Sequence, residues 1–140
     1  WIKVSGRGLN IKPSDNVEML KALGKDPLVI KETRIGTIYG LANLMDAALA
    51  TSGNLLSPSL ILYGEKDDVI PKTPMLVMLK SLIKHGESST RVGFYKNGYH
   101  MLLRDLQANV VMEDIAAWIL NRNKELPSGA DRRNIFLRSK

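Results

Sequence analysis

The segment ILYGEKDDVIP, from Ile61 to Pro71, decides the fold. The apolar run that leads into it, residues 59–63, lies between a proline and a glycine, which is typical of a parallel strand covered on both faces. The run leads into three acidic residues, Glu65, Asp67 and Asp68. Open parallel sheets bind their ligands beyond the carboxyl ends of the strands, so these carboxylates are candidates for function.

A helix, a second strand and a last helix follow this segment. Thr73 and Pro74 are typical of an N-cap and a first helical turn, and the helix is predicted to end near residue 85. Residues 90–95 read as the second strand, and an amphipathic helix covers residues 108–122. The apolar side of that helix carries Val111, Ile115, Trp118 and Ile119. Two strands cannot bury both faces of a sheet, so we expect further strands upstream of this chain.

The first fifty residues are predicted to be helical, with no strand. Asp15 and Glu18 have capping-box spacing ahead of a short helix over residues 16–23. A longer helix covers residues 35–51. Its apolar stripe consists of Ile38, Leu41, Met45 and Ala48. An apolar cap over a catalytic face suits an acyl chain, and packing of these side chains onto the sheet is the alternative.

These elements predict three parts. Residues 1–56 form a helical cap, or lid; residues 57–126 form part of an α/β core; and residues 127–140 form a basic tail. The tail holds Arg132, Arg133, Arg138 and Lys140. We interpret it as a solvated, poorly ordered terminus and expect no nucleic-acid partner, because no aromatic residues interleave with the basic ones.

Composition narrows the function further. The chain has 140 residues, a net charge of +6, 44% hydrophobic residues and no cysteine, which excludes disulfides, thiolate metal sites and a cysteine nucleophile. Two histidines without metal-binding spacing predict no transition-metal site. No apolar run approaches the roughly 18 to 20 residues that cross a bilayer, so we expect this portion to be soluble or peripheral, with the compartment open.

A second loop completes the chemical pattern. The segment KNGYHMLLRD, residues 96–105, follows the second predicted strand and contains His100. Neighbouring strands lie about 4.8 Å apart, so an imidazole and a carboxylate at their carboxyl ends can meet. A carboxylate that holds one imidazole nitrogen orients the ring and stabilises the imidazolium formed when the other nitrogen takes a proton. The order Asp then His, each after a strand, is that of the second half of an α/β-hydrolase triad.

Both loops carry a family resemblance. GEKDDVIP resembles the acid loop of α/β-hydrolases, in which a strand ends in Gly-x-x-Asp and a proline follows, and this implies Asp67 as the triad acid, with Asp68 as its rival. GYHMLLRD resembles the histidine loop, which implies His100 as the catalytic base. The cap-like helices and both loops most resemble the monoacylglycerol lipase and lysophospholipase group of serine hydrolases.

The nucleophile of that family is missing from these residues. It lies in a Gly-x-Ser-x-Gly turn, and the closest string here, residues 86–90, lacks the second glycine. We therefore expect the C-terminal portion of an α/β-hydrolase fold preceded by a helical cap, with the serine upstream and this piece inactive alone. The resemblance implies an ester hydrolase (EC 3.1.1 class) that acts on monoacylglycerol or lysophospholipid without cofactor or metal.

Several alternatives stay open. The same two loops occur in epoxide hydrolases, dehalogenases and peptidases, and a non-catalytic binding module could share the core. Asp67 could be only a turn former, and His100 only a core histidine. The three acids could bind Mg²⁺ or Ca²⁺, although the EF-hand pattern is absent. Expected partners are a small lipid or ester substrate, a membrane surface in transient contact, and another chain at an exposed sheet edge.

Overall fold

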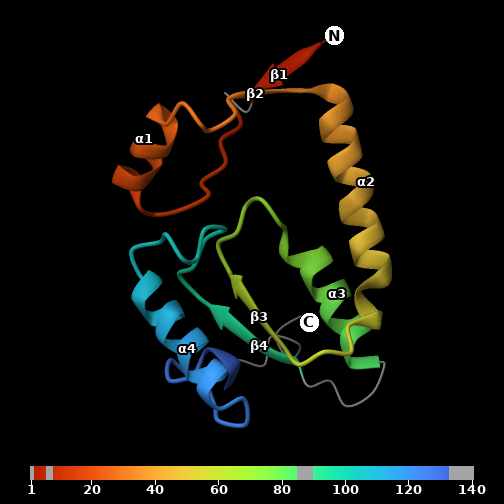
Figure 1. Cartoon of the computed structure of the whole chain (residues 1–140), viewed down its shortest axis with the longest axis vertical. Coiled ribbons are helices and arrows are strands. Elements are labelled where there is room, and N and C mark those ends of the chain that lie inside the picture. Colours follow the sequence, from red (N-terminus) through yellow and green to blue (C-terminus); the bar gives the residue numbers. More distant parts are fainter. Residues whose placement is uncertain (1, 6–7, 85–89, 133–140) are drawn as a thin grey trace.

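A computed structural model describes residues 2–5, 8–84 and 90–132, and it contains a parallel α/β unit beneath a smaller N-terminal part (Figure 1). The parallel unit has two strands, β3 (Ser59–Gly64) and β4 (Thr90–Tyr95), and two helices, α3 (Lys72–Lys84) and α4 (Ala108–Leu120). The remaining elements are β1 (Lys3–Ser5), α1 (Val17–Lys25), β2 (Glu32–Arg34), α2 (Ile35–Thr51) and the 3-10 turns η1 (Ser52–Asn54) and η2 (Ala130–Arg132).

The parallel pair β3–β4 forms the centre of the fold, with Ser59 opposite Thr90 and Gly64 opposite Tyr95. Alternate residues of each strand face opposite sides. On one side, Tyr63 and Phe94 meet edge to face with ring centroids 6.2 Å apart, and they pack with the α3 side chains in a buried cluster. In Figure 1, α3 and α4 lie on opposite sides of the pair. Both predicted strands and the helix between them are therefore confirmed.

The helix after β3 begins two residues earlier than predicted, at Lys72 and not at Pro74. Thr73 therefore lies inside the first turn and is not the N-cap. Pro74 also lies in that turn, where the missing amide hydrogen costs no intrahelical bond. Residue 85, the predicted end of the helix, lies outside the described residues.

The prediction of no strand among the first fifty residues is wrong. β1 and β2 pair antiparallel, with Lys3 opposite Arg34 and Ser5 opposite Glu32. Each strand has only three residues, too few for an alternating pattern to be recognised in the sequence. This small sheet and α1 lie beyond the carboxyl ends of β3 and β4 (Figure 1).

The N-cap of α1 is Asn16 and not the predicted Asp15. The Asn16 side chain accepts a hydrogen bond from the Met19 amide at 3.0 Å, which is the normal N-cap contact. Asp15 instead accepts one from the amide of Leu106 at 2.8 Å, 91 residues further along. Two adjacent residues could each cap this helix, and the tertiary contact of Asp15 decides between them.

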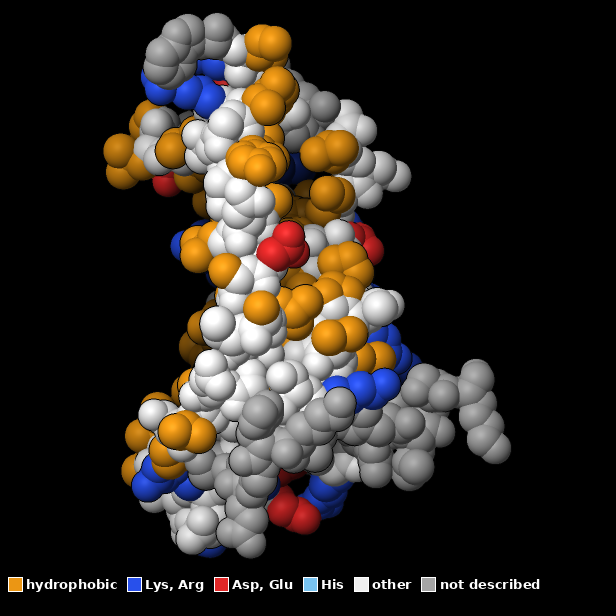
Figure 2. Space-filling view, turned by 90° about the vertical axis from the view of Figure 1, so that its right-hand side faces the viewer, with side chains coloured by type: hydrophobic (Ala, Val, Ile, Leu, Met, Phe, Trp, Pro, Cys, Tyr) orange, Lys and Arg blue, Asp and Glu red, His pale blue; other side chains and the backbone are white. Residues whose placement is uncertain are grey.

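The long helix α2 has the predicted bounds, Ile35–Thr51, but its predicted stripe does not pack onto the sheet. Three members of the stripe are about half exposed, namely Ile38 (46%), Leu41 (56%) and Met45 (48%), and Ala48 is exposed as well. Figure 2 views this side of the molecule, where hydrophobic side chains reach the surface. Among the described residues, no helix has both the length and the apolar character needed to cross a membrane.

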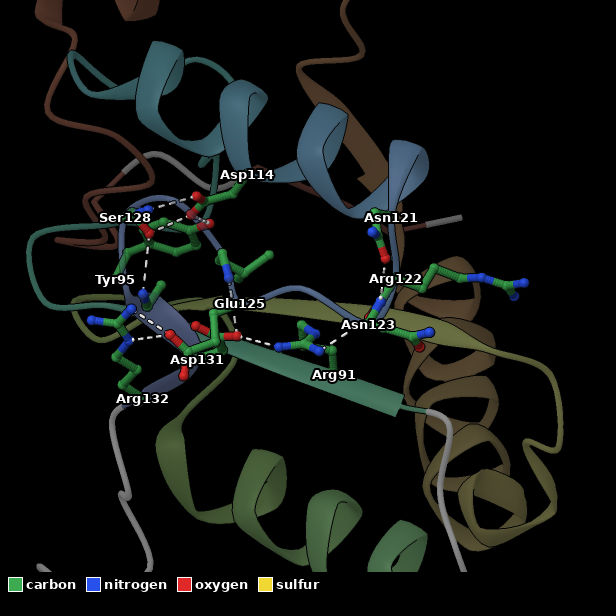
Figure 3. Close-up of polar contacts among 12 residues, drawn as sticks. Arg91, Tyr95, Asp114, Asn121, Arg122, Asn123, Glu125, Ser128, Asp131 and Arg132 are labelled. Carbon is green, nitrogen blue, oxygen red and sulfur yellow. Dashed lines mark hydrogen bonds and ion pairs between the residues drawn. The ribbon is translucent and has the colours of Figure 1, made fainter.

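The C-terminal segment packs against the sheet as far as residue 132, so the expectation of a solvated terminus is wrong for that part. Leu126 and Ala130 are buried. Asp131 pairs with Arg91 of β4 at 2.5 Å and also accepts the Leu126 amide at 3.1 Å (Figure 3). Residues 133–140 lie outside the described residues.

Of the predicted apolar side of α4, Val111 is buried, Ile115 and Trp118 are partly buried, and Ile119 is exposed. Ile119 is 68% exposed, so the helix uses a narrower apolar side than its pattern indicated.

A buried aspartate of α4 joins the C-terminal segment to the end of β4. Asp114 is fully buried and accepts hydrogen bonds from the Tyr95 hydroxyl at 2.7 Å, from the Ser128 amide at 2.9 Å and from the Ser128 hydroxyl (Figure 3). Burial raises the pKa of Tyr95 above its ordinary value, and the hydrogen bond to Asp114 and the charge of that carboxylate raise it further. The phenol is therefore held in its protonated form.

This raised pKa predicts an alkaline loss of stability. The unfolded chain releases the Tyr95 proton near pH 10 and the folded chain releases it only at higher pH, so the free energy of unfolding falls above about pH 10, by at most about 1.4 kcal/mol per pH unit for this group. Tyr95→Phe should lower stability at pH 7 by about 2 kcal/mol and remove that share of the slope. Urea unfolding of the full-length protein at pH 7 to 11 measures both; an unchanged slope contradicts the assignment.

Candidate active site

The two loops that follow β3 and β4 bring Asp67 and His100 together. Asp67 Oδ2 and His100 Nδ1 lie 2.9 Å apart, within hydrogen-bonding distance. The Asp67 side chain is only 6% exposed, whereas that of His100 is 37% exposed. The carboxylate is therefore shielded, while the imidazole remains accessible. With Nδ1–H donating to Asp67, the other ring nitrogen, Nε2, is left as a proton acceptor.

The second oxygen of Asp67 fixes the orientation of the carboxylate. Asp67 Oδ1 accepts the amide of Val69 at 2.7 Å and the amide of Ile70 at 2.9 Å. Both oxygens are thus occupied, one by the backbone of its own loop and one by His100. The rival acid, Asp68, is exposed, and it is not the residue that meets His100. The structure therefore pairs His100 with the acid of the Gly-x-x-Asp pattern.

Backbone hydrogen bonds join the acid loop to the histidine loop. The amide of Glu65 donates to the Tyr95 carbonyl at 2.9 Å, and the amide of Lys66 donates to the Gly98 carbonyl at 2.9 Å. The first continues the parallel ladder past the end of β3, and the second reaches a residue only two positions before His100. The separation of the two candidate side chains is therefore set by main-chain contacts.

Gly64 is required because the two loops approach each other closely. A Cβ atom at this position would lie 2.5 Å from the carbonyl carbon of Gly98 and from the carbonyl oxygen of Tyr99. These are backbone atoms that cannot turn aside, unlike the end of a flexible side chain. The glycine in the Gly-x-x-Asp pattern thus has a steric reason here.

Tyr63 of β3 holds the acid loop through its hydroxyl group, a role that its position in an apolar run does not indicate. Its ring is buried and its hydroxyl donates to the Ile70 carbonyl at 2.9 Å, so Ile70 is held at its carbonyl by Tyr63 and at its amide by Asp67. Burial raises the pKa of Tyr63, and the carboxylates of Asp67 and Glu65 raise it further. The hydroxyl therefore remains a donor to the loop.

An open hollow of about 510 Å³ adjoins His100. Its lining includes Leu60 and Leu62 of β3 and Val111 and Ile115 of α4. The residues that follow the histidine, from Met101 to Arg104, complete the lining. The imidazole therefore borders a mainly apolar depression.

The acids of the first loop are not grouped together in the part of the chain that the structure describes. Among the described residues, no group of three or more histidine, aspartate or glutamate side chains is placed to hold a metal ion. The oxygens of Asp67 are already engaged by two amides and an imidazole.

A parallel α/β unit with an aspartate and a histidine on successive post-strand loops is the C-terminal arrangement of an α/β-hydrolase. The chain matches the family model described as serine aminopeptidase, S33, over residues 1–107, and it belongs to that family of α/β-hydrolase-type hydrolases. The matched range includes both Asp67 and His100. No curated protein matches the chain. The predicted superfamily and fold class are confirmed.

The close approach at Gly64 gives a specific prediction. Gly64→Ala places a methyl group against the backbone of Gly98 and Tyr99, so the two loops must separate, by about 1 Å if the methyl group is to fit. We expect turnover by the full-length protein to fall about 100-fold, because a shift of this size misplaces the reacting groups. Gly24→Ala is the matched control, since a Cβ there meets nothing within 4 Å. Equal activity of both variants would show that the loops tolerate the change.

Proposed function

We propose that this chain supplies the acid and the base of a Ser-Asp-His triad, with Asp67 as the acid and His100 as the base. The observation that carries the proposal is the 2.9 Å contact between Asp67 Oδ2 and His100 Nδ1 at the carboxyl ends of adjacent parallel strands. Membership of a serine hydrolase family supports it. The serine comes from outside these 140 residues, since no Gly-x-Ser-x-Gly sequence occurs in them.

The proposed reaction is acyl transfer in two halves. The serine hydroxyl attacks the substrate carbonyl while His100 Nε2 takes its proton, and the imidazolium then gives that proton to the leaving alcohol. A water molecule next attacks the acyl-enzyme, again losing a proton to His100. The carboxylic acid departs, and the proton returns to the serine. Asp67 holds the ring in the required tautomer and stabilises each imidazolium.

The proposed substrate is a carboxylic ester with an apolar acyl chain, such as a monoacylglycerol or a lysophospholipid. Three observations support this class: the resemblance of both loops to that group of hydrolases, the apolar hollow beside His100, and the exposed apolar side chains of α2. In this proposal residues 1–56 act as a lid, and residues 57–126 carry the acid and the histidine. Acyl-chain contacts with the lid would use side chains that the sheet does not cover.

The name of the matched family favours a second candidate, an aminopeptidase that releases an N-terminal residue from a peptide. The triad chemistry would be the same, with an amine in place of the alcohol as leaving group. The two candidates differ in the substrate pocket. Parallel assays of the full-length protein with a long-chain monoacylglycerol and with an aminoacyl anilide distinguish them. The substrate with the higher kcat/KM identifies the substrate class.

The triad assignment predicts a sharp contrast between neighbouring acids. In the full-length protein, Asp67→Asn should lower kcat about 10⁴-fold, because the amide stabilises the wrong imidazole tautomer, and His100→Ala should lower it at least as far. Asp68→Asn is the matched control and should retain turnover near wild type, since the exposed Asp68 does not meet His100. Ester hydrolysis at saturating substrate measures all three. Loss of activity in Asp68→Asn with retention in Asp67→Asn would reverse the assignment.

A covalent probe locates the nucleophile. A fluorophosphonate should label the full-length protein at a serine outside residues 1–140, and His100→Ala should abolish the labelling. Mass spectrometry of the labelled peptide provides the test. A label on a serine within residues 1–140 would contradict the proposed origin of the nucleophile.

A further inference from the structure

We propose that Asp105 is a positioning residue for His100, and that with Ser14 it joins the segment leading into α1 to the histidine loop. The inference rests on the proposed function, because it concerns the placement of the same imidazole. Asp105 does not contact His100. It acts through the amide of Tyr99, the residue before His100, and through Ser14, which follows the Pro13 carbonyl that accepts the amide of Met101.

Asp105 is one of the few buried charged side chains in the part of the chain that the structure describes. Its exposed fraction is 5%, and Ser14, its partner, is fully buried. Ser14 Oγ donates to Asp105 Oδ1 at 2.6 Å, and the amide of Tyr99 donates to Asp105 Oδ2 at 2.8 Å. Burying a carboxylate is costly unless it is hydrogen-bonded, so each of these contacts compensates a desolvation penalty.

These contacts hold the chain immediately before and after His100. The Tyr99 amide, on the N-terminal side, is bonded to the Asp105 carboxylate. The Met101 amide, on the C-terminal side, donates to the Pro13 carbonyl at 2.9 Å. Both anchors lie outside the strand that delivers the loop. The backbone on both sides of His100 is therefore held by groups that neither β4 nor the acid loop supplies, while Asp67 of the acid loop holds the ring itself.

The segment from Pro13 to Asn16 is the common attachment of these anchors. Ser14 Oγ, besides donating to Asp105, accepts the Asn16 amide at 3.2 Å, which closes a turn just before α1. Two further contacts join this segment to the stretch after His100. The Leu106 amide donates to Asp15 Oδ1 at 2.8 Å, and Asn16 Nδ2 donates to the Arg104 carbonyl at 3.1 Å.

A movement of α1 away from the sheet must therefore break contacts with Asp105 or pull on the loop that carries His100. The N-terminal part and the base are mechanically coupled at this point. The consequence for catalysis is that Asp105 controls how often the imidazole is in its reactive position, without touching the substrate.

The test compares two buried aspartates in the full-length protein. Asp105→Ala removes the acceptor for the Tyr99 amide and should lower kcat about 100-fold at nearly unchanged KM, as expected for a shift of about 1 Å in a reacting group. Asp114→Ala is the matched control: it removes another buried carboxylate, whose hydrogen bonds go to Tyr95 and Ser128 and not to residues 96–105 of the histidine loop. It should lower the melting temperature and retain kcat per folded molecule, with the folded fraction taken from circular dichroism.

Asp105→Asn provides the rescue variant. Its amide oxygen can accept the Tyr99 amide and its NH₂ group can donate to Ser14 Oγ, so we expect kcat within about 10-fold of wild type, well above that of the alanine variant. A spectroscopic readout follows the same order. The downfield Nδ1 proton resonance of His100, which reports its hydrogen bond to Asp67, should be lost in Asp105→Ala and kept in Asp105→Asn and Asp114→Ala.

The possible outcomes separate this inference from the proposed function. If His100→Ala is inactive but Asp105→Ala keeps wild-type kcat per folded molecule, the positioning role is wrong and the triad stands. If His100→Ala retains turnover, the proposed function fails first. Should Asp105→Ala not fold, Ser14→Ala gives the answer: a drop in kcat of about 10-fold with the folded fraction preserved supports the link, and an unchanged kcat overturns it.

Discussion

The parallel register of β3 and β4 is the constraint on which the site depends. Gly64 lies opposite Tyr95, so both strands end at the same level and release their loops at the same edge. The ladder then continues into the loops, through the amide of Glu65 to the Tyr95 carbonyl and the amide of Lys66 to the Gly98 carbonyl. A slip of this register would carry Asp67 along the strand by about 3.3 Å per residue, more than the 2.9 Å that separates it from His100. The hydrogen bond between the two side chains is a consequence of strand pairing.

The strands, the helices and the two loops of the parallel unit could be predicted because their signals are local. The boundaries of β4 and α2 follow from apolar runs and helical spacing. The choice of Asp67 over Asp68 as the partner of His100 follows from the Gly-x-x-Asp spacing, in which Asp67 comes three residues after Gly64. The steric need for glycine at that point explains why the pattern carries information: a side chain there would meet the backbone of the opposite loop. A role in catalysis for Asp67 and His100 remains a prediction until the variants are assayed.

The rest could not be predicted because it depends on contacts between distant segments. Strands of three residues leave no periodicity, so the sequence does not predict β1 and β2. Asp15 and Asn16 are equally good N-caps, and only the contact of Asp15 with residue 106 separates them. The apolar stripe of α2 predicts burial, yet a helical pattern states only that one face is apolar and not what covers it. The C-terminal segment has a basic composition, but Asp131 and its partner Arg91 hold its first residues against β4.

Asp105 and Asp114 illustrate why residues that position a site are harder to predict from the sequence than the reacting residues themselves. Both are buried aspartates beside apolar residues, and the sequence alone ranks neither above the other. Their partners distinguish them: Asp114 holds the C-terminal segment through Ser128, whereas Asp105 holds the peptide before His100 through the Tyr99 amide. The acid and the histidine are 33 residues apart and join through strands that pair directly. Ser14 and Asp105 are 91 residues apart and meet only once the segment before α1 lies against the histidine loop. The reacting groups are thus recorded in short motifs. The contacts that position these groups depend on the packing of the N-terminal part. A substitution in that part can therefore change the geometry of the site without changing either motif.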